Sequence, residues 1–278
     1  MTRFAACFLL VFGELALGGM FALAIPPFFK VERGFYKSSA SVYLVAGLVT
    51  AIGLAFLAIR GGASEGPSAA ALWTAAGFWT LFSAVFATYL YTLWFDNGWL
   101  RARSFTLGLG MGIMALAFNA IILTPAGFGI AADVGAVLTA LTSGLVLGLT
   151  SGAMLFGHWY LIDLEMPVDY LRTFMRVLVG AIIANIGATL VSVVLLWLAG
   201  GTMGAGAVGS LLGPNLMLGT MWFALGPAAT IVLVWMCWQT LKIPQTMAAT
   251  GLLYIAVMSV LVGEMLSRFI LFRTSVPL

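Results

Sequence analysis

Residues 174–199 read FMRVLVGAIIANIGATLVSVVLLWLA, and this stretch decides the class of fold. After Arg176 it contains no charged residue up to position 199. A helix that crosses the hydrocarbon core of a bilayer needs about 20 mostly apolar residues. A transmembrane strand is shorter and alternates apolar with polar positions, and this stretch does not alternate. The stretch therefore predicts a transmembrane helix.

Seven further runs of this kind predict an all-α, polytopic integral membrane protein with eight transmembrane helices. The runs cover residues 4–28, 40–60, 69–94, 104–125, 135–162, 174–199, 212–239 and 247–271. The longest connections, 29–39, 163–173 and 200–211, are too short for an extramembrane domain, and the glycine-rich residues 200–209 are expected to form a flexible outer loop. We expect one helical-bundle domain over residues 1–278, with two four-helix halves, 1–126 and 134–272, as a possible subdivision.

The composition excludes several classes of protein. Hydrophobic residues make up 63% of the 278 residues and charged residues 8%, with a mean hydropathy of +1.12. Soluble proteins are about half apolar and a quarter charged, so a soluble enzyme and a disordered chain are excluded. A net charge of +3 is too small for a nucleic-acid-binding surface. Cys7 and Cys237 lie inside apolar runs and form neither a disulfide framework nor a metal motif.

Loop charges predict the orientation of the helices, because Lys and Arg are more frequent in cytoplasmic loops. The connections after the first, third, fifth and seventh runs and their edges hold Lys30, Arg33, Lys37, Arg101, Arg103, Arg172, Arg176 and Lys242. The opposite side holds only Arg3, Arg60 and Arg273. Both termini are therefore expected outside the cytoplasm.

The first run has some features of a signal peptide. Arg3 precedes it, and Ala22-Leu23-Ala24 is similar to a cleavage site. Its apolar stretch is longer than that of an ordinary signal peptide, and it contains Glu14. We expect a retained first helix.

Glycines at four-residue spacing predict close contacts between helices. They are Gly144, Gly148 and Gly152 in the fifth run and Gly108 and Gly112 in the fourth. Packing within the bundle is the favoured interpretation, and an interface between subunits is the alternative.

Ionisable residues inside spans are costly and are candidates for function. Glu14 lies within the first run, and Glu264 and Arg268 stand four residues apart in the last, so they share a helix face. All three reach comparable depths from the outer surface, and we expect them to converge. The cluster would hold an exchangeable proton beside a quinone, or would be an ionic clasp between helices.

A second group of candidates lies at the cytoplasmic end of the fifth run. His158, the only histidine, is followed by Asp163 and Glu165, and Trp159 and Tyr160 adjoin it. These residues suit a quinone or proton-entry pocket. The alternative is an aromatic belt at the membrane interface. Two features are structural predictions. Interhelical hydrogen bonding is the favoured role of the polar residues Asn119, Asn185, Asn215 and Gln239, and a kink is expected at Pro227.

The two ends of the chain resemble the NrfD-like family, the membrane-anchor subunits of dimethyl sulfoxide reductase-type and polysulfide reductase-type complexes. Phe12-Gly13-Glu14 followed by Gly18-Gly19-Met20-Phe21 is similar to the F-G-x4-G-G-F run of their first helix. Gly263-Glu264-Met265-Leu266-Ser267-Arg268 is similar to their closing G-E-x-x-G-R. Ser267 stands where the family usually has glycine, and the connection after the second run has no histidine, where some members place a quinol-associated one.

The resemblance implies a subunit without a covalently bound cofactor, in a bacterial-type inner (cytoplasmic) membrane. Such a subunit holds an iron–sulfur or cytochrome partner at the bilayer and contributes a quinone or quinol site; a bound lipid is compatible with this role. It is not catalytic alone but belongs to a membrane oxidoreductase of a respiratory chain. No metal-ligand cluster and no nucleic-acid partner is expected.

Two other functions stay open. In a proton-coupled secondary transporter, Glu14 and Glu264 would bind protons and Pro227 would mark a broken helix. In a purely structural subunit of a redox or photosynthetic assembly, the chain would bind lipid or pigment without chemistry, although a single histidine argues against extensive pigment ligation.

Overall fold

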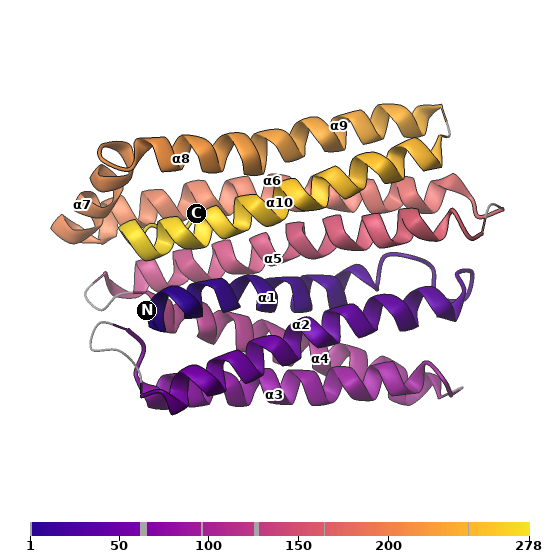
Figure 1. Cartoon of the computed structure of the whole chain (residues 1–278), viewed down its shortest axis with the longest axis horizontal. Coiled ribbons are helices and arrows are strands. Elements are labelled where there is room, and N and C mark those ends of the chain that lie inside the picture. Colours follow the sequence, from indigo (N-terminus) through magenta and orange to yellow (C-terminus); the bar gives the residue numbers. More distant parts are fainter. Residues whose placement is uncertain (1, 62–65, 96, 125–127, 164, 244) are drawn as a thin grey trace.

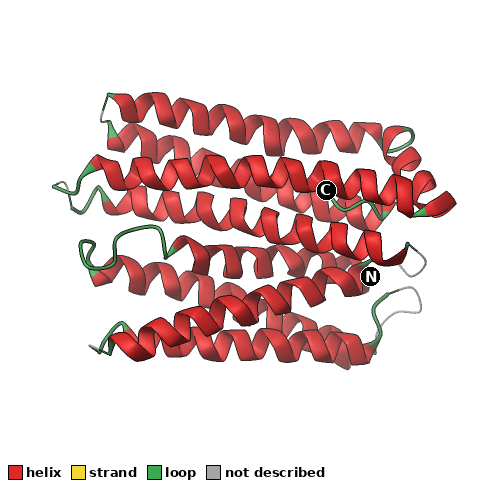
Figure 2. Cartoon of the chain, turned by 180° about the vertical axis from the view of Figure 1, so that it is seen from behind, coloured by secondary structure: helices red, strands yellow, loops and turns green. Residues whose placement is uncertain are grey.

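The computed structural model describes residues 2–61, 66–95, 97–124, 128–163, 165–243 and 245–278. Every regular element in this part of the chain is a helix, as Figure 2 shows. Eight helical spans are long and apolar enough to cross a membrane. The predicted fold class, an all-α protein with eight transmembrane helices, is confirmed.

The described residues form ten α-helices and one π-helical segment, of which all but α7 belong to the eight spans. They are α1 (Thr2–Ala22), α2 (Arg33–Ile59), α3 (Ala69–Thr92), α4 (Gly98–Leu123), α5 (Gly129–Trp159), α6 (Val168–Ala199), α7 (Gly201–Leu212), α8 (Leu216–Phe223), the π-helix η1 (Ala224–Ala228), α9 (Ala229–Lys242) and α10 (Thr246–Thr274). The seventh span is composite, because α8, η1 and α9 together cover Leu216–Lys242.

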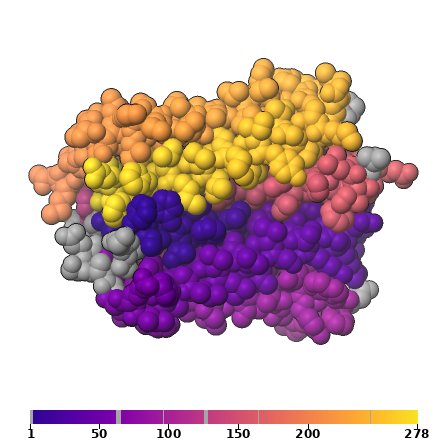
Figure 3. All heavy atoms as spheres, in the orientation of Figure 1, coloured from indigo at the N-terminus to yellow at the C-terminus, as the bar shows by residue number. Residues whose placement is uncertain are grey.

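Helix α1 lies at the centre of the bundle (Figure 1). It packs against α2 and α4 on one side and against α5 and α10 on the other. The chain of contacts α2–α3–α4 completes the first group of spans, and α5 contacts α6 and α10 in the second. On the face shown in Figure 3, α10 runs directly beside α1 although they are the last and first helices of the sequence.

Glycines bring α1 and α5 unusually close together. A Cβ atom on Gly18 would overlap the carbonyl group of Gly144, and one on Gly148 would overlap the backbone of Gly18. The other predicted packing glycines also lie at contacts within the chain: Gly152 faces Ala22 and Phe174, Gly108 faces Met20, and Gly112 faces Leu17 and Phe82. Small residues allow such backbone approach in membrane helices, where close packing drives association.

Several helices extend beyond the predicted runs. Helix α2 begins at Arg33 and α6 at Val168, both earlier than predicted, whereas α1 ends at Ala22 and not at the predicted residue 28. The first connection is therefore shifted from 29–39 to 23–32, and the connection predicted at 163–173 is shortened to 160–167. The first helix turns of α2 and α6 contain Arg33 and Asp169, and hydropathy alone misses them because a helix can continue past the apolar core into the headgroup layer.

The prediction of a flexible loop over residues 200–209 is wrong. Residues 201–212 form α7, which packs against α6, α8 and α10. Gly201 adopts a positive φ of 59°, which lets the chain turn sharply between α6 and α7. The glycine-rich composition therefore serves this turn and the close packing of Gly204 on the Leu196 carbonyl group.

The predicted kink at Pro227 takes the form of η1. A proline inside a helix lacks the N–H group for the usual hydrogen bond, and a π-helical turn accommodates that loss. Gly226 in this segment packs directly on Gly263 of α10. The seventh span is thus irregular where it packs on Gly263, the residue directly before Glu264.

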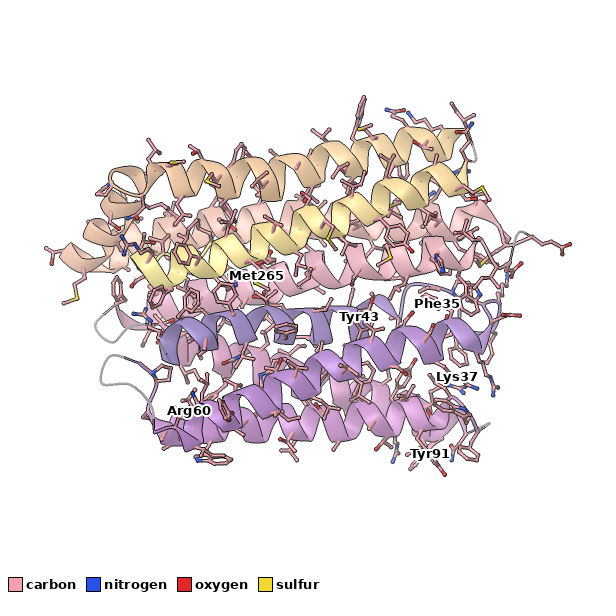
Figure 4. The ribbon with its side chains drawn as sticks, in the orientation of Figure 1. Phe35, Lys37, Tyr43, Arg60, Tyr91 and Met265 are labelled. Carbon is pink, nitrogen blue, oxygen red and sulfur yellow. The ribbon has the colours of Figure 1, made fainter. Side chains whose placement is uncertain are left out.

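The cations gather at one end of the bundle, as the loop charges predicted. Figure 4 shows Lys37 near Phe35 and Tyr91 at one end, and Arg60 at the opposite end. Cations at the richer end stack on aromatic rings: Lys37 Nζ lies 4.6 Å from the centroid of Trp94, and the Arg103 guanidinium lies 3.7 Å from that of Trp99. Such pairs of aromatic and cationic residues are typical of a membrane interface.

Candidate functional site

The predicted convergence of Glu14, Glu264 and Arg268 is present in the structure. Arg268 Nη2 lies 2.8 Å from Glu14 Oε1 and 3.2 Å from Glu264 Oε2. Glu14 is fully buried, Arg268 is 1% exposed, and the Glu264 side chain is 11% exposed. One guanidinium therefore bridges two carboxylates from opposite ends of the sequence inside the bundle.

The neighbouring backbone fixes the positions of these three side chains. Glu264 and Arg268 are one turn apart on α10, so both point toward the α1 side of that helix. Gly144 of α5 lies against the backbone of Glu14, since a Cβ there would be 3.3 Å from the Glu14 carbonyl oxygen. The glycine face of α5 therefore lets α1 sit deep enough for Glu14 to reach Arg268.

Hydrogen bonding in the cluster is incomplete. Arg268 Nη2 donates to Glu264 Oε2, but its approach to Glu14 is an ion-pair contact without hydrogen-bond direction. Among the described residues, neither Glu14 oxygen nor Arg268 Nε has a hydrogen-bond partner. An unsatisfied buried polar atom is costly. The carboxylate oxygens of the cluster can therefore accept a proton.

A small cavity, lined in part by polar side chains, adjoins Glu264 but not Glu14. Its volume is about 30 Å³, enough for one water molecule. Ser143 of α5 interacts with the Glu264 carboxylate, and Asn185 Nδ2 of α6 donates to Ser143 Oγ over 3.1 Å and to Thr142 Oγ1 over 3.2 Å. The interhelical hydrogen bonding predicted for Asn185 is confirmed, whereas neither side-chain polar atom of the buried Asn119 has a hydrogen-bond partner among the described residues. Polar groups therefore extend from Asn185 to Glu14 across four helices.

The irregular seventh span and the last residues of the sequence complete the wall of this cavity. Gly226 and Pro227 of η1 line it, as does Leu278. Ser275 has a positive φ of 63°, which turns the chain back after α10, and Ser267 Oγ donates to the Leu278 main-chain oxygen over 2.5 Å. Ser267 therefore holds this segment against the bundle.

An apolar groove lies between α6 and the α9 part of the seventh span. Its volume is about 530 Å³. It shares Ile182 and Ile186 with the cavity beside Glu264, so the two spaces adjoin. Trp235 and Trp238 form part of its wall, and Arg176 lies at its cation-rich end. The groove is therefore an apolar and aromatic space beside the cavity of Glu264.

The structure does not gather the second group of candidates into a pocket. His158 is exposed, and its Nδ1 lies 3.1 Å from the Tyr254 hydroxyl oxygen. Asp163 Oδ1 accepts a hydrogen bond from the backbone N–H of Glu165 in a local turn. Among the described residues, no interaction joins His158 to either carboxylate, and none of the three lines the spaces described above.

Tyr160, beside His158, has a structural role. Its hydroxyl donates to the Pro167 carbonyl oxygen over 2.7 Å and accepts from the Leu171 N–H over 3.2 Å, which ties the end of α5 to the start of α6.

The sequence analysis did not select Ser143 as a site residue. The signal was weak, because a serine inside an apolar run usually bonds to its own helix. Its position directly before Gly144, on the helix face that approaches α1, is the one feature that could have identified it.

Comparisons with known proteins provide no family assignment. No family model matches the chain, no curated protein is similar to it, and no solved structure matches its fold.

Proposed function

We propose that this chain is the membrane-anchor subunit of a multi-subunit electron-transfer complex and that its Glu14–Arg268–Glu264 cluster serves quinone chemistry. The observation that supports this is the buried ion-pair geometry of the cluster. It joins the two stretches of sequence, around Glu14 and around Glu264, that resemble the NrfD-like family. Glu14 and Glu264, which are far apart in sequence, thus meet in the region for which the resemblance implies a function.

The charge balance of the cluster favours one exchangeable proton. Two carboxylates and one guanidinium carry a net charge of −1 when all three are ionised, and an uncompensated charge is unfavourable at this depth. One proton on the pair of carboxyl groups neutralises the cluster. Glu264 is the group that exchanges it, because Glu264 lines the cavity with Ser143 while Glu14 is fully enclosed.

The space beside the cluster fits a quinone in part. The cavity of about 30 Å³ holds a water molecule but not a quinone ring. The adjoining groove of about 530 Å³ has tryptophan walls for a ring and isoleucine side chains for an isoprenoid tail. Reduction of a quinone consumes protons together with electrons. Glu264 and Ser143 would supply or accept those protons from the cavity side.

A partner would deliver the electrons. Among the described residues, no group of His, Cys, Asp and Glu could hold a metal ion. In this proposal an iron–sulfur or cytochrome subunit docks on the bundle, and the chain resides in a bacterial-type inner membrane with both ends outside the cytoplasm. Isolation in mild detergent tests the partner. Co-purification of a redox subunit supports the proposal, and a chain that is fully active alone overturns it.

Glu264→Gln tests the role of the proton. This change keeps the size and hydrogen bonding of the side chain and removes the exchangeable proton. The complex should assemble at its normal level and lose quinone-linked turnover by about 100-fold. Glu32→Gln, at an exposed carboxylate, is the matched control and should leave turnover unchanged. Normal turnover in an assembled Glu264→Gln complex would exclude this role, and failed assembly would favour the ionic clasp.

One observation favours the proton-coupled transporter as the second candidate. The π-helical break at Gly226–Pro227 faces the cavity of Glu264, and broken helices beside ionisable residues are typical of transporter sites. Proteoliposomes that contain only this chain distinguish the two functions. Substrate uptake that depends on a pH gradient would support the transporter, and its absence together with a co-purified redox subunit would support the anchor.

A further inference from the structure

A second large pocket lies at the cation-rich end of the bundle, away from the ionic cluster. It is formed by the connection between α1 and α2, the end of α3 and the start of α4, and its volume is about 500 Å³. Its walls are largely apolar and include the aromatic residues Phe28, Phe29, Tyr89 and Phe105. The pocket shares no lining residue with the cavity or the groove beside Glu264.

One cation in the wall of this pocket has no ion-pair partner among the residues that the structure describes. The Arg101 guanidinium carbon lies 4.1 Å from the centroid of the Phe28 ring, and this contact holds the side chain against the pocket. Among the described residues, no ion pair engages Arg101, and its Nη1 has no hydrogen-bond partner. Tyr89 lies close enough for electrostatic interaction with this guanidinium and brings a phenol hydroxyl to the same wall.

The surroundings reinforce the positive charge. Lys30 and Arg103 lie on the same segments and Lys37 lies near the start of α2, and Glu32 is the only acidic residue described on these segments. Lys37 and Arg103 both stack on tryptophan rings of the interface. An anion at this depth would therefore meet Arg101 within a field of further cations. The apolar walls at the same time favour a ligand that carries a hydrocarbon part.

We propose that this pocket binds an acidic phospholipid from the adjacent leaflet, with its phosphate at Arg101 and Tyr89 and its glycerol and upper acyl carbons against Phe28 and Phe105. Basic pockets at the interface between transmembrane helices bind acidic lipid headgroups in this way. Phe29, which is 92% exposed, extends from the pocket rim and provides apolar surface for the acyl chains. The proposal does not depend on the quinone function.

Native mass spectrometry of the full chain in detergent tests the pocket. Dioleoylphosphatidylglycerol and dioleoylphosphatidylcholine are titrated separately, and the dissociation constant of the first bound lipid is compared. The wild-type chain should bind the anionic lipid at least fivefold more tightly, and Arg101→Gln should remove about that factor. Arg60→Gln is the matched control, because Arg60 also stacks on a phenylalanine, Phe56, but lies at the opposite end.

Ala102→Trp tests the space of the pocket separately from its charge. Ala102 lines the pocket and is exposed, so tryptophan there fills the space, keeps every cation and tests the site even if Arg101→Gln does not fold. It should weaken the binding of the anionic lipid as strongly as Arg101→Gln does. Equal binding of the two lipids by the wild type, unchanged binding after Ala102→Trp, or an equal loss after Arg60→Gln would overturn the proposal. So would displacement of the lipid by millimolar inorganic phosphate, which would assign the site to a free anion.

Discussion

Arg268 is the residue on which the interior of the bundle depends most. It is a 1% exposed cation, and its charge is balanced only by Glu14 and Glu264 among the described residues. Removing one member of a buried ion pair leaves the remaining charges unpaired, which costs more than the pair itself contributed. The loss of Arg268 is therefore expected to cost more than the loss of either carboxylate's exchangeable proton.

Arg268→Gln should strongly destabilise the protein. We expect a loss of about 3–5 kcal/mol, because two carboxyl groups then face each other without a cation. Arg273→Gln, an exposed position on the same helix, should change the free energy of unfolding by less than about 0.5 kcal/mol. Unfolding in mixed detergent micelles, followed by tryptophan fluorescence, measures both. Similar unfolding midpoints for the two variants would contradict this prediction.

His158→Ala decides between the two interpretations of the histidine. Its exposed side chain and its contact with Tyr254 are compatible with an interfacial belt. If His158 instead serves a quinone or proton-entry pocket with Asp163 and Glu165, the variant complex should assemble and show reduced quinone-linked turnover. Turnover equal to that of the wild type in an assembled complex would assign His158 to the belt.

Spacing explains why the sequence predicted one group of residues better than the other. Glu264 and Arg268 had to share a helix face, and similar depths in antiparallel spans placed Glu14 beside them. The neighbourhood of His158 could not be deduced in this way, since Asp163 and Glu165 follow the end of α5, where helical periodicity no longer applies. Ser143 was missed because its contact with Glu264 depends on how closely α5 approaches α10.

At the scale of helices, apolar length predicted the spans, while their ends and irregularities needed the tertiary structure. Hydropathy does not register a helix that continues into the headgroup layer, as α2 does at Arg33. The glycine-rich composition also predicted a loop where α7 forms. The packing against α6, α8 and α10 stabilises this segment as a helix. At Pro227 the sequence indicated a kink but not its π-helical form.

The contact between α1 and α5 should tolerate no side chain at Gly148. Gly148→Leu would force its side chain into the backbone of Gly18, and overpacking of this kind costs at least about 1–3 kcal/mol. Gly180→Leu, on α6 with open space around it, is the matched control and should be neutral. Fluorescence-detected size-exclusion chromatography after heating compares them. Equal apparent melting temperatures would show that α1 and α5 can separate without cost.

At the scale of the whole molecule, the unequal charge at the two ends predicts which end faces the cytoplasm. The described helices place Lys37 and Arg60 at opposite ends of α2 (Figure 4). A cation-rich end retained in the cytoplasm would leave both chain termini outside.

Cysteine labelling in intact cells tests this orientation. Cys7 and Cys237 are buried, so they should give little background with a membrane-impermeant maleimide. Arg60→Cys should react from outside the cell, and Lys37→Cys should react only after permeabilisation. The reverse pattern would invert the topology, while the helical packing described above would be unaffected.

The two partners of the ion pair between α1 and α10 are synthesised at very different times. Arg268 follows Glu14 by 254 positions, so at about 5–20 residues per second it is made roughly 13–50 s later. Throughout that interval Glu14 has no Arg268 with which to pair, and an unpaired carboxylate inside a membrane is costly. A chain that stops before α10 would leave Glu14 in that state.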